Sequence, residues 1–141
     1  MITINGKVPS KSNSYQIITL RPKGRKPHSS LAKTQHVKNY ELSFRIQLPQ
    51  EMKKMRIESV FAIFVTVYFE FKRSDLDNAM KIILDSLQNC GVIKNDNQCF
   101  GIITEKKISK RPKIEFELMP MFEFEKVINF TKELISSQEG K

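Results

Sequence analysis

Three aspartates, Asp75, Asp77 and Asp96, are the side chains of this sequence whose type and spacing best suit chemistry. Asp75 and Asp77 are two residues apart, so both carboxylates point to the same side if the backbone there is extended. A return of the chain after Gly91 would bring Asp96 toward the pair. Hard divalent cations such as Mg²⁺ take oxygen ligands and usually keep several waters. We therefore predict a site for Mg²⁺, with Mn²⁺ as the alternative ion, and the surplus of Lys and Arg suggests phosphate chemistry.

Lys81 and Asp85 continue the polar face that Asp77 begins, at spacings of four residues. One helical turn separates Lys81 from Asp77. Lys81 could hold a phosphate oxygen and offset the charge that develops in a transition state, or it could form only a weak surface pair. Asp85 is interpreted as a partner of Lys81 rather than as a ligand. Asp75 also has a structural interpretation, as the N-cap residue of the helix that follows.

The net charge of +9 is concentrated at the N-terminal end of the chain, because residues 1–40 contain eight Lys and Arg side chains and no Asp or Glu. A basic arm on a balanced body is the electrostatic footprint of a protein that binds a polyanion, most simply a nucleic acid. A solubilising loop is the alternative. We predict that DNA phosphates are held by basic side chains of this arm and of positions near the aspartates: Lys7, Lys11, Arg21, Lys23, Arg25, Lys26, Lys33, Lys72, Arg73 and Lys94.

The segment before the aspartates is expected to contain the buried strand that delivers them. Residues 60–71 are β-branched and aromatic almost throughout, which is typical of a central strand covered on both faces. Residues 1–5 predict a short strand. Residues 7–35 predict a basic loop rich in Ser and Pro, and residues 36–48 predict a helix with apolar side chains four apart.

The segment after the aspartate pair predicts an alternation of helices and strands. Apolar side chains recur at spacings of three and four over residues 77–89, and Gly91 is placed to end that helix in the left-handed conformation. Residues 100–108 and 114–118 predict two strands joined by a basic hairpin tip. Residues 122–137 predict a last helix with a broad apolar face.

The length of 141 residues fits one domain. We expect an α+β fold in which helices pack on a mixed β-sheet over residues 1–120, followed by a helical extension over residues 121–141. Cys90 and Cys99 lack the spacing of a zinc site and suggest a reducing compartment. No apolar run reaches the length of a membrane span and no leader pattern opens the chain, so a soluble, cytoplasmic protein is expected.

Around the aspartates the chain resembles a known family, the RusA-type Holliday junction resolvases of phages, prophages and bacteria. The family signature is similar to the pattern formed here by Asp75-Leu76-Asp77-Asn78, Lys81, Asp85, Leu87, Gly91-Val92-Ile93 and Asp96. The order of elements around the signature fits from Ile2 to about Met119, and the opening Ile4-Asn5-Gly6-Lys7 resembles the first strand and loop of the family. One position departs: the family often has two adjacent acids where this chain has Asn95-Asp96, so the site has one negative charge fewer.

The resemblance implies a homodimeric, Mg²⁺-dependent endonuclease that resolves four-way DNA junctions in recombination and repair by paired symmetric nicks. It implies Asp75, Asp77 and Asp96 as metal-binding carboxylates and Lys81 as the catalytic lysine. A two-fold dimer would supply the two equivalent sites that paired nicks need.

Two other functional classes stay open from the residues. A non-catalytic nucleic-acid-binding protein of a phage or prophage would bind DNA equally well in chelator and would tolerate loss of Asp75. A phosphatase of the Asp-x-Asp type would use the first aspartate as a nucleophile at the end of the buried strand. Against the phosphatase, the motif enters a helix almost at once and no parallel α/β succession is expected to follow.

Overall fold

The most apolar run of the sequence forms the inner strand β4 (Phe61–Phe69) of a four-stranded sheet. The computed structural model describes residues 1–10 and 13–140. In its sheet the strand order is β1-β6-β4-β5, where β1 is Ile2–Asn5, β5 is Cys99–Ile108 and β6 is Lys113–Pro120. β4 is antiparallel to β6 and parallel to β5, so the sheet is mixed and the α+β expectation is confirmed.

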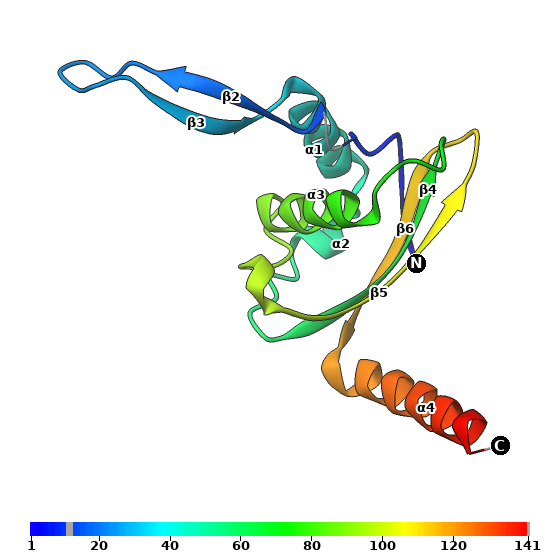
Figure 1. The fold of residues 1–141 in the computed structure, drawn as a ribbon. Coiled ribbons are helices and arrows are strands. Elements are labelled where there is room, and N and C mark those ends of the chain that lie inside the picture. The colour runs from blue at the N-terminus through cyan, green and yellow to red at the C-terminus, as the bar shows by residue number, and fades with distance from the viewer. Residues whose placement is uncertain (11–12, 141) are drawn as a thin grey trace.

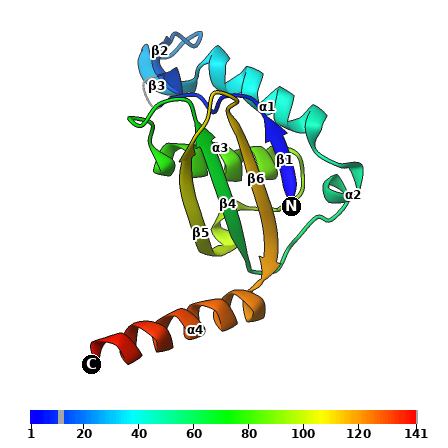
Figure 2. The same cartoon turned by 90° about the vertical axis from the view of Figure 1, so that its right-hand side faces the viewer.

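Two helices cover one face of this sheet (Figures 1 and 2). α1 (Gln35–Gln47) and α3 (Leu76–Asn89) place their apolar stripes against β4 and β6, and Phe44 stacks on Phe116 with ring centroids 5.9 Å apart. α3 ends as the sequence predicts, because Gly91 adopts a φ of 76° and the Val92 N–H donates to the carbonyl of Leu87 at 3.0 Å. A short helix, α2 (Gln50–Lys53), and a 3₁₀ turn, η2 (Asp96–Gln98), complete this side.

The two strands after α3 do not form the hairpin that the sequence predicts. β4 lies between β5 and β6, and the turn at residues 109–112 crosses the end of β4, where the Ser109 N–H donates to the carbonyl of Phe69 at 2.8 Å. β4, α3 and β5 instead form a parallel β-α-β unit, so the expectation that no parallel succession follows was wrong. The reason is that the crossover through α3 returns the chain to the free edge of β4.

The segment at residues 7–35 also differs from the expected loop. It contains an antiparallel hairpin of β2 (Tyr15–Leu20) and β3 (His28–Lys33), whose far end projects away from the sheet (Figure 1). The apolar residues of β2 were visible in the sequence. The Ser-rich β3 carried no strand pattern, because most side chains of an exposed two-stranded ribbon need not be apolar.

The last helix, α4 (Met121–Glu139), leaves the end of β6 and extends beyond the sheet (Figures 1 and 2). Its start lies against β4, β5 and β6. The Phe124 ring covers Gly101 of β5 so closely that a Cβ there would lie 2.5 Å from the ring. None of the α4 side chains is buried. In the part of the chain that the structure describes, no helix is long and apolar enough to cross a membrane.

Candidate active site

The aspartate pair lies where the chain leaves β4 and enters α3. Asp75 is the residue before the first turn of α3, with extended backbone, and Asp77 is in that first turn. Both side chains are exposed. Asp75 makes no side-chain capping hydrogen bond to α3, although its position is that of an N-cap. The capping interpretation therefore does not explain why an aspartate stands at residue 75.

Asn78 fixes the N-terminal loop against the start of α3. Its side-chain amide is 8% exposed and donates to the carbonyl of Pro9 at 2.8 Å and to the Ser14 hydroxyl at 3.3 Å. The Asn78 N–H in turn donates to Asp77 Oδ1 at 2.9 Å. The sequence reasoning assigned no role to Asn78. Its position directly after the aspartates was the available signal, but only the fold shows that its partners are some 65 residues away.

This loop and the end of β4 enclose a cleft beside Asp75. The cleft has a volume of about 540 Å³ and is lined by polar and charged residues together with one aromatic ring: Lys7, Ser10, Asn13, Phe71, Arg73, Ser74 and Asp75. The Lys7 ammonium lies 5.3 Å and the Arg73 guanidinium 5.0 Å from the centroid of the Phe71 ring. Cation–ring contacts of this kind hold the two positive charges at the mouth of the aspartate site.

Lys106 of β5 holds the segment that leads into the aspartates. Its ammonium donates to the backbone carbonyl of Ser74 at 2.6 Å and also to that of Lys72. It lies 5.5 Å from the ring centroid of Phe69, at the end of β4. The edge strand thus fixes the backbone immediately before Asp75. Sequence reasoning missed this contact, because it joins residues 32 positions apart.

Lys81 lies one turn after Asp77 on the exposed face of α3. Its ammonium is 4.4 Å from the centroid of the Tyr15 ring, at the base of the β2–β3 hairpin. Asp85 follows one turn later and is half-buried. Burial raises the pKa of Asp85 above the usual range, and the positive charges of Lys33 and Lys81 oppose that shift. These charges support the interpretation of Asp85 as a helix-face partner of Lys81.

Asp96 lies beside the C-terminal half of α3. Its backbone N–H donates to Gln88 Oε1 at 3.0 Å. The negative charge of Asp96 contributes to the raised pKa of Asp85. Two helical turns, roughly 12 Å along the axis, separate Asp85 from Asp77. The chain does return toward α3 after Gly91, as expected, but it reaches the far part of the polar face rather than the start of the helix.

The three predicted metal ligands fit a divalent ion in kind. Asp75, Asp77 and Asp96 are all exposed carboxylates on one side of α3, and such oxygens suit a hard cation. They are not gathered into a ready site. Over residues 1–10 and 13–140, no three His, Cys, Asp or Glu side chains lie close enough together to hold a metal ion. Asp75 and Asp77 both lie at the start of α3, and Asp96 would have to approach them.

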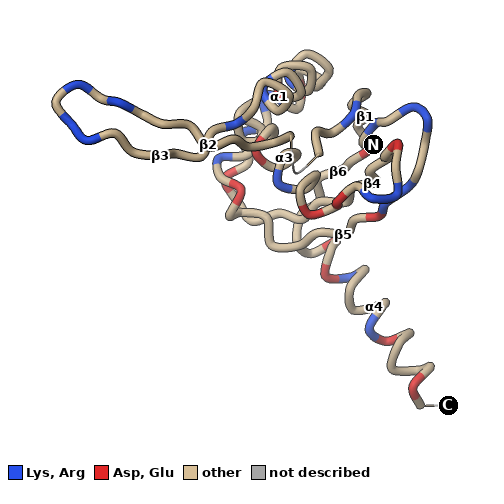
Figure 3. Tube along the Cα trace, turned by 45° about the horizontal axis from the view of Figure 1, so that its top comes forward, with Lys and Arg blue, Asp and Glu red and all other residues tan. Residues whose placement is uncertain are grey.

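The predicted DNA-binding side chains fall into three groups. Arg21, Lys23, Arg25 and Lys26 are exposed at the far end of the hairpin, where Figure 3 shows the basic residues gathered. Lys7, Lys72 and Arg73 surround the start of α3, and Lys7 also pairs with Glu70 at 3.6 Å. Lys94 is exposed at the other end of α3. Lys11 lies outside the described residues.

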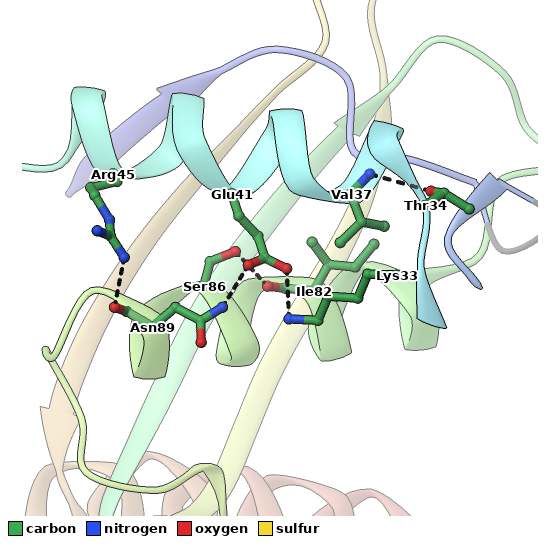
Figure 4. A network of polar contacts seen from close by, with 8 residues as sticks. All are labelled: Lys33, Thr34, Val37, Glu41, Arg45, Ile82, Ser86 and Asn89. Carbon is green, nitrogen blue, oxygen red and sulfur yellow. Dashed lines mark hydrogen bonds and ion pairs between the residues drawn. The ribbon is translucent and has the colours of Figure 1, made fainter. Parts of the chain in front are cut away.

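Lys33 differs from the rest of that set because it is engaged within the protein. Its ammonium lies 2.8 Å from Glu41 Oε1, and the Asn89 amide donates to the other Glu41 oxygen at 2.5 Å (Figure 4). Burial alone would lower the pKa of Lys33, but the hydrogen bond and charge of Glu41 raise it. The Glu41 carboxylate therefore ties the base of β3 to α1 and α3.

Two further contacts belong to the same network, one that joins α1 to α3 and one that caps α1. The Arg45 guanidinium donates to the carbonyl of Asn89 at 3.0 Å, and the Thr34 hydroxyl caps α1 by accepting from the Val37 N–H at 3.4 Å (Figure 4). The hairpin base, α1 and α3 thus form one connected polar layer next to Lys81.

Comparison with known proteins gives a consistent result. The sequence model of the family described as "Endodeoxyribonuclease RusA" matches residues 15–119. A curated protein of Aquifex aeolicus (strain VF5), "Crossover junction endodeoxyribonuclease RusA", is 36% identical over 101 residues, which cover 71% of this chain and 74% of that relative. The matched span includes the hairpin, the aspartates, Lys81 and every strand of the sheet except β1.

Proposed function

The chain belongs to the RusA family of endodeoxyribonucleases, and we propose that it is a Mg²⁺-dependent Holliday junction resolvase that cuts four-way DNA junctions by paired symmetric nicks. The observation that carries this proposal is the grouping of Asp75, Asp77 and Lys81 at the start of α3, beside a cleft with two cations at its mouth. Carboxylates for an ion and cations for phosphates are the two requirements of phosphodiester hydrolysis.

Asp75, Asp77 and Asp96 are the residues that would hold the ion, with Mn²⁺ as a substitute for Mg²⁺. When bound, a divalent ion lowers the pKa of water and shields the non-bridging phosphate oxygens. Asp96 has to move toward the pair for all three to act together, and a divalent cation between the carboxylates would favour that approach.

The other residues of the site act on the DNA. Lys81 neutralises the negative charge that grows on the scissile phosphate as water attacks in line. Lys7 and Arg73 hold the neighbouring phosphates at the cleft, and the N-terminus of α3 adds the positive end of its dipole. Lys106 keeps the Ser74 carbonyl fixed, which orients the backbone from which Asp75 projects.

A homodimer is part of the proposal, because two nicks in opposed strands need two equivalent sites. The sheet face opposite α1 and α3 and the exposed apolar stripe of α4 are the surfaces that a second copy could cover. That stripe consists of Phe122, Val127, Phe130 and Leu134, which are 46–62% exposed. Apolar side chains on such a projecting helix are typical of an interaction surface.

The two rival classes have less support. A protein that only binds DNA would have its acids explained by capping, but Asp75 makes no side-chain cap. One observation favours a phosphatase, namely the parallel β4-α3-β5 unit, which the sequence did not predict. However, the cleft opens toward cations suited to an extended polyanion, and the family match favours a nuclease.

The test uses a labelled four-way junction incubated with wild-type protein in Mg²⁺ and in chelator. Cutting should occur only with the metal. Asp75→Asn, Asp77→Asn and Asp96→Asn should each abolish cutting and keep or tighten junction binding, because removal of a negative charge eases phosphate approach.

Asp85→Asn is the matched control, because Asp85 lies on the same face of α3 and is not assigned to the metal. It should cut at close to the wild-type rate. If Asp77→Asn cuts normally, the carboxylate assignment is wrong. If Asp85→Asn is as inactive as Asp96→Asn, the third ligand must be reassigned.

A further inference from the structure

The structure points to Tyr15 as the positioning residue for Lys81. We infer that the base of the β2–β3 hairpin holds the ammonium group of this catalytic lysine in position through the face of the Tyr15 ring. The inference rests on the proposed function, since it concerns the lysine of the proposed reaction. The Lys81 ammonium is 4.4 Å from the ring centroid, the shortest lysine–ring distance among the residues that the structure describes.

The contact acts through the ring rather than through the hydroxyl. The Tyr15 hydroxyl oxygen is buried and has no hydrogen-bond partner within residues 1–10 and 13–140. A hydroxyl that directed Lys81 would need to be bonded to it or to a neighbour. The negative face of an aromatic ring, in contrast, attracts an ammonium group without any such bond.

The backbone that carries the ring is held in place from the opposite strand. Tyr15 pairs with Lys33 in the hairpin ladder, and Lys33 is fixed by the ion pair with Glu41 of α1. Glu41 also accepts from Asn89 near the end of α3 (Figure 4). The hairpin base is thus connected to α3 at two places. Tyr15 contacts Lys81 directly, and Lys33 is connected to Asn89 through Glu41 of α1.

The same strand connects this contact to the basic tip. β2 runs from Tyr15 to Leu20, directly before the turn that contains Arg21 and Lys23. One short strand therefore connects the predicted DNA-binding side chains of the hairpin tip to the residue that contacts Lys81. A long, flexible lysine side chain loses much rotamer freedom when it acts at one place. A fixed ring beneath the ammonium removes part of that cost before the DNA arrives.

Single-turnover cutting of a labelled junction separates positioning from binding. Tyr15→Leu should slow cutting roughly tenfold, the size expected when one cation–ring contact is lost, with less than a twofold change in junction affinity. Tyr15→Phe keeps the ring and should cut at close to the wild-type rate.

Lys81→Ala provides a second set of cutting measurements. If Tyr15 acts through Lys81, adding Tyr15→Leu to Lys81→Ala should slow cutting no further. Additive losses would overturn the inference while leaving the proposed function intact. If Lys81→Ala cuts normally, the lysine assignment of the proposed function fails, and the inference fails with it.

A measurement independent of activity uses protein whose lysines carry ¹³C-methyl groups. The Lys81 resonance, assigned by its loss in Lys81→Arg, should be displaced upfield by the ring in the wild type and in Tyr15→Phe, and should move to the position of an exposed lysine in Tyr15→Leu. An undisplaced Lys81 resonance in the wild type would overturn the inference even if Tyr15→Leu does not fold.

Discussion

The β2–β3 hairpin and α4 both extend beyond the sheet, but they differ in charge and in attachment. Residues 15–33 contain five Lys and Arg side chains and no acid, whereas residues 121–139 contain two Lys and four Glu. The hairpin base is attached to α1 by the ion pair of Lys33 with Glu41, and Glu41 is in turn hydrogen-bonded to Asn89 of α3. α4 is attached by apolar contacts centred on Phe124 over Gly101.

The difference indicates two kinds of partner. A ribbon with basic side chains at its far end suits a polyanion, and its firm polar base lies next to Lys81. A helix with no buried side chain and a stripe of exposed apolar ones suits another protein surface. The hairpin is therefore expected to govern DNA affinity, and α4 is expected to govern assembly.

The strongest test of this division removes the charge of the hairpin tip. Replacing Arg21, Lys23, Arg25 and Lys26 together by Gln should lower junction affinity by about 10² to 10³ at moderate salt. The slope of log affinity against log salt should fall by up to about 3.6, because each phosphate contact contributes about 0.9. An unchanged slope would mean that the tip is only a solvated loop.

The next test removes α4 by ending the chain at Pro120. Light scattering at micromolar concentration should show a dimer for the full chain and a monomer for the shortened one, because the exposed stripe is lost. The salt slope of junction binding per subunit should stay the same. A dimer that survives the truncation would assign α4 to its own subunit and leave assembly to the sheet.

A smaller effect is expected at the contact that joins α4 to the sheet. Gly101→Ala places a Cβ 2.5 Å from the Phe124 ring, so the ring must move. The free energy of unfolding should fall by about 1–3 kcal/mol, the usual cost of overpacking. The same substitution in a Phe124→Ala background should cost much less. Equal costs in both backgrounds, measured by urea titration, would show that the ring does not cover Gly101 in solution.

The smallest effect concerns Asp85, which faces the hairpin base. Its folded-state pKa is raised by burial, so its contribution to stability is present below the unfolded pKa of about 3.9 and is lost as the pH rises through the folded pKa. Above the folded pKa the charged Asp85 lowers stability, and Asp85→Asn should there raise the free energy of unfolding by less than about 1 kcal/mol. This gain should shrink as the pH falls through the folded pKa and should be lost below about pH 4. A gain that grows on acidification would contradict the assignment.

The sequence predicted the elements with strong apolar periods, and it failed where the structure depends on distant partners. β4, α1 and α3 follow from the apolar runs of the sequence, and the end of α3 follows from Gly91. The hairpin was missed because the side chains of β3 are mostly polar. The order of β5 and β6 was missed because neighbours in sequence need not be neighbours in a sheet.

The candidate site was predictable to a similar extent. The aspartate pair and Lys81 were found from their spacing, and their roles remain predictions. Asn78, Lys106 and Tyr15 were not assigned roles, because each acts on a residue more than 30 positions away. The position of Asp96 was only partly predictable, since the length of the return after Gly91 does not fix which turn of α3 it reaches.

The central claim is metal-dependent, paired cutting at the α3 aspartates, and a supercoiled plasmid that extrudes a cruciform tests it most directly. In Mg²⁺ the wild-type protein should convert the plasmid to linear DNA with two nicks placed symmetrically across the junction. Asp77→Asn should leave the plasmid supercoiled while still binding it. Linear product from Asp77→Asn, or none from the wild type with either Mg²⁺ or Mn²⁺, would contradict the account.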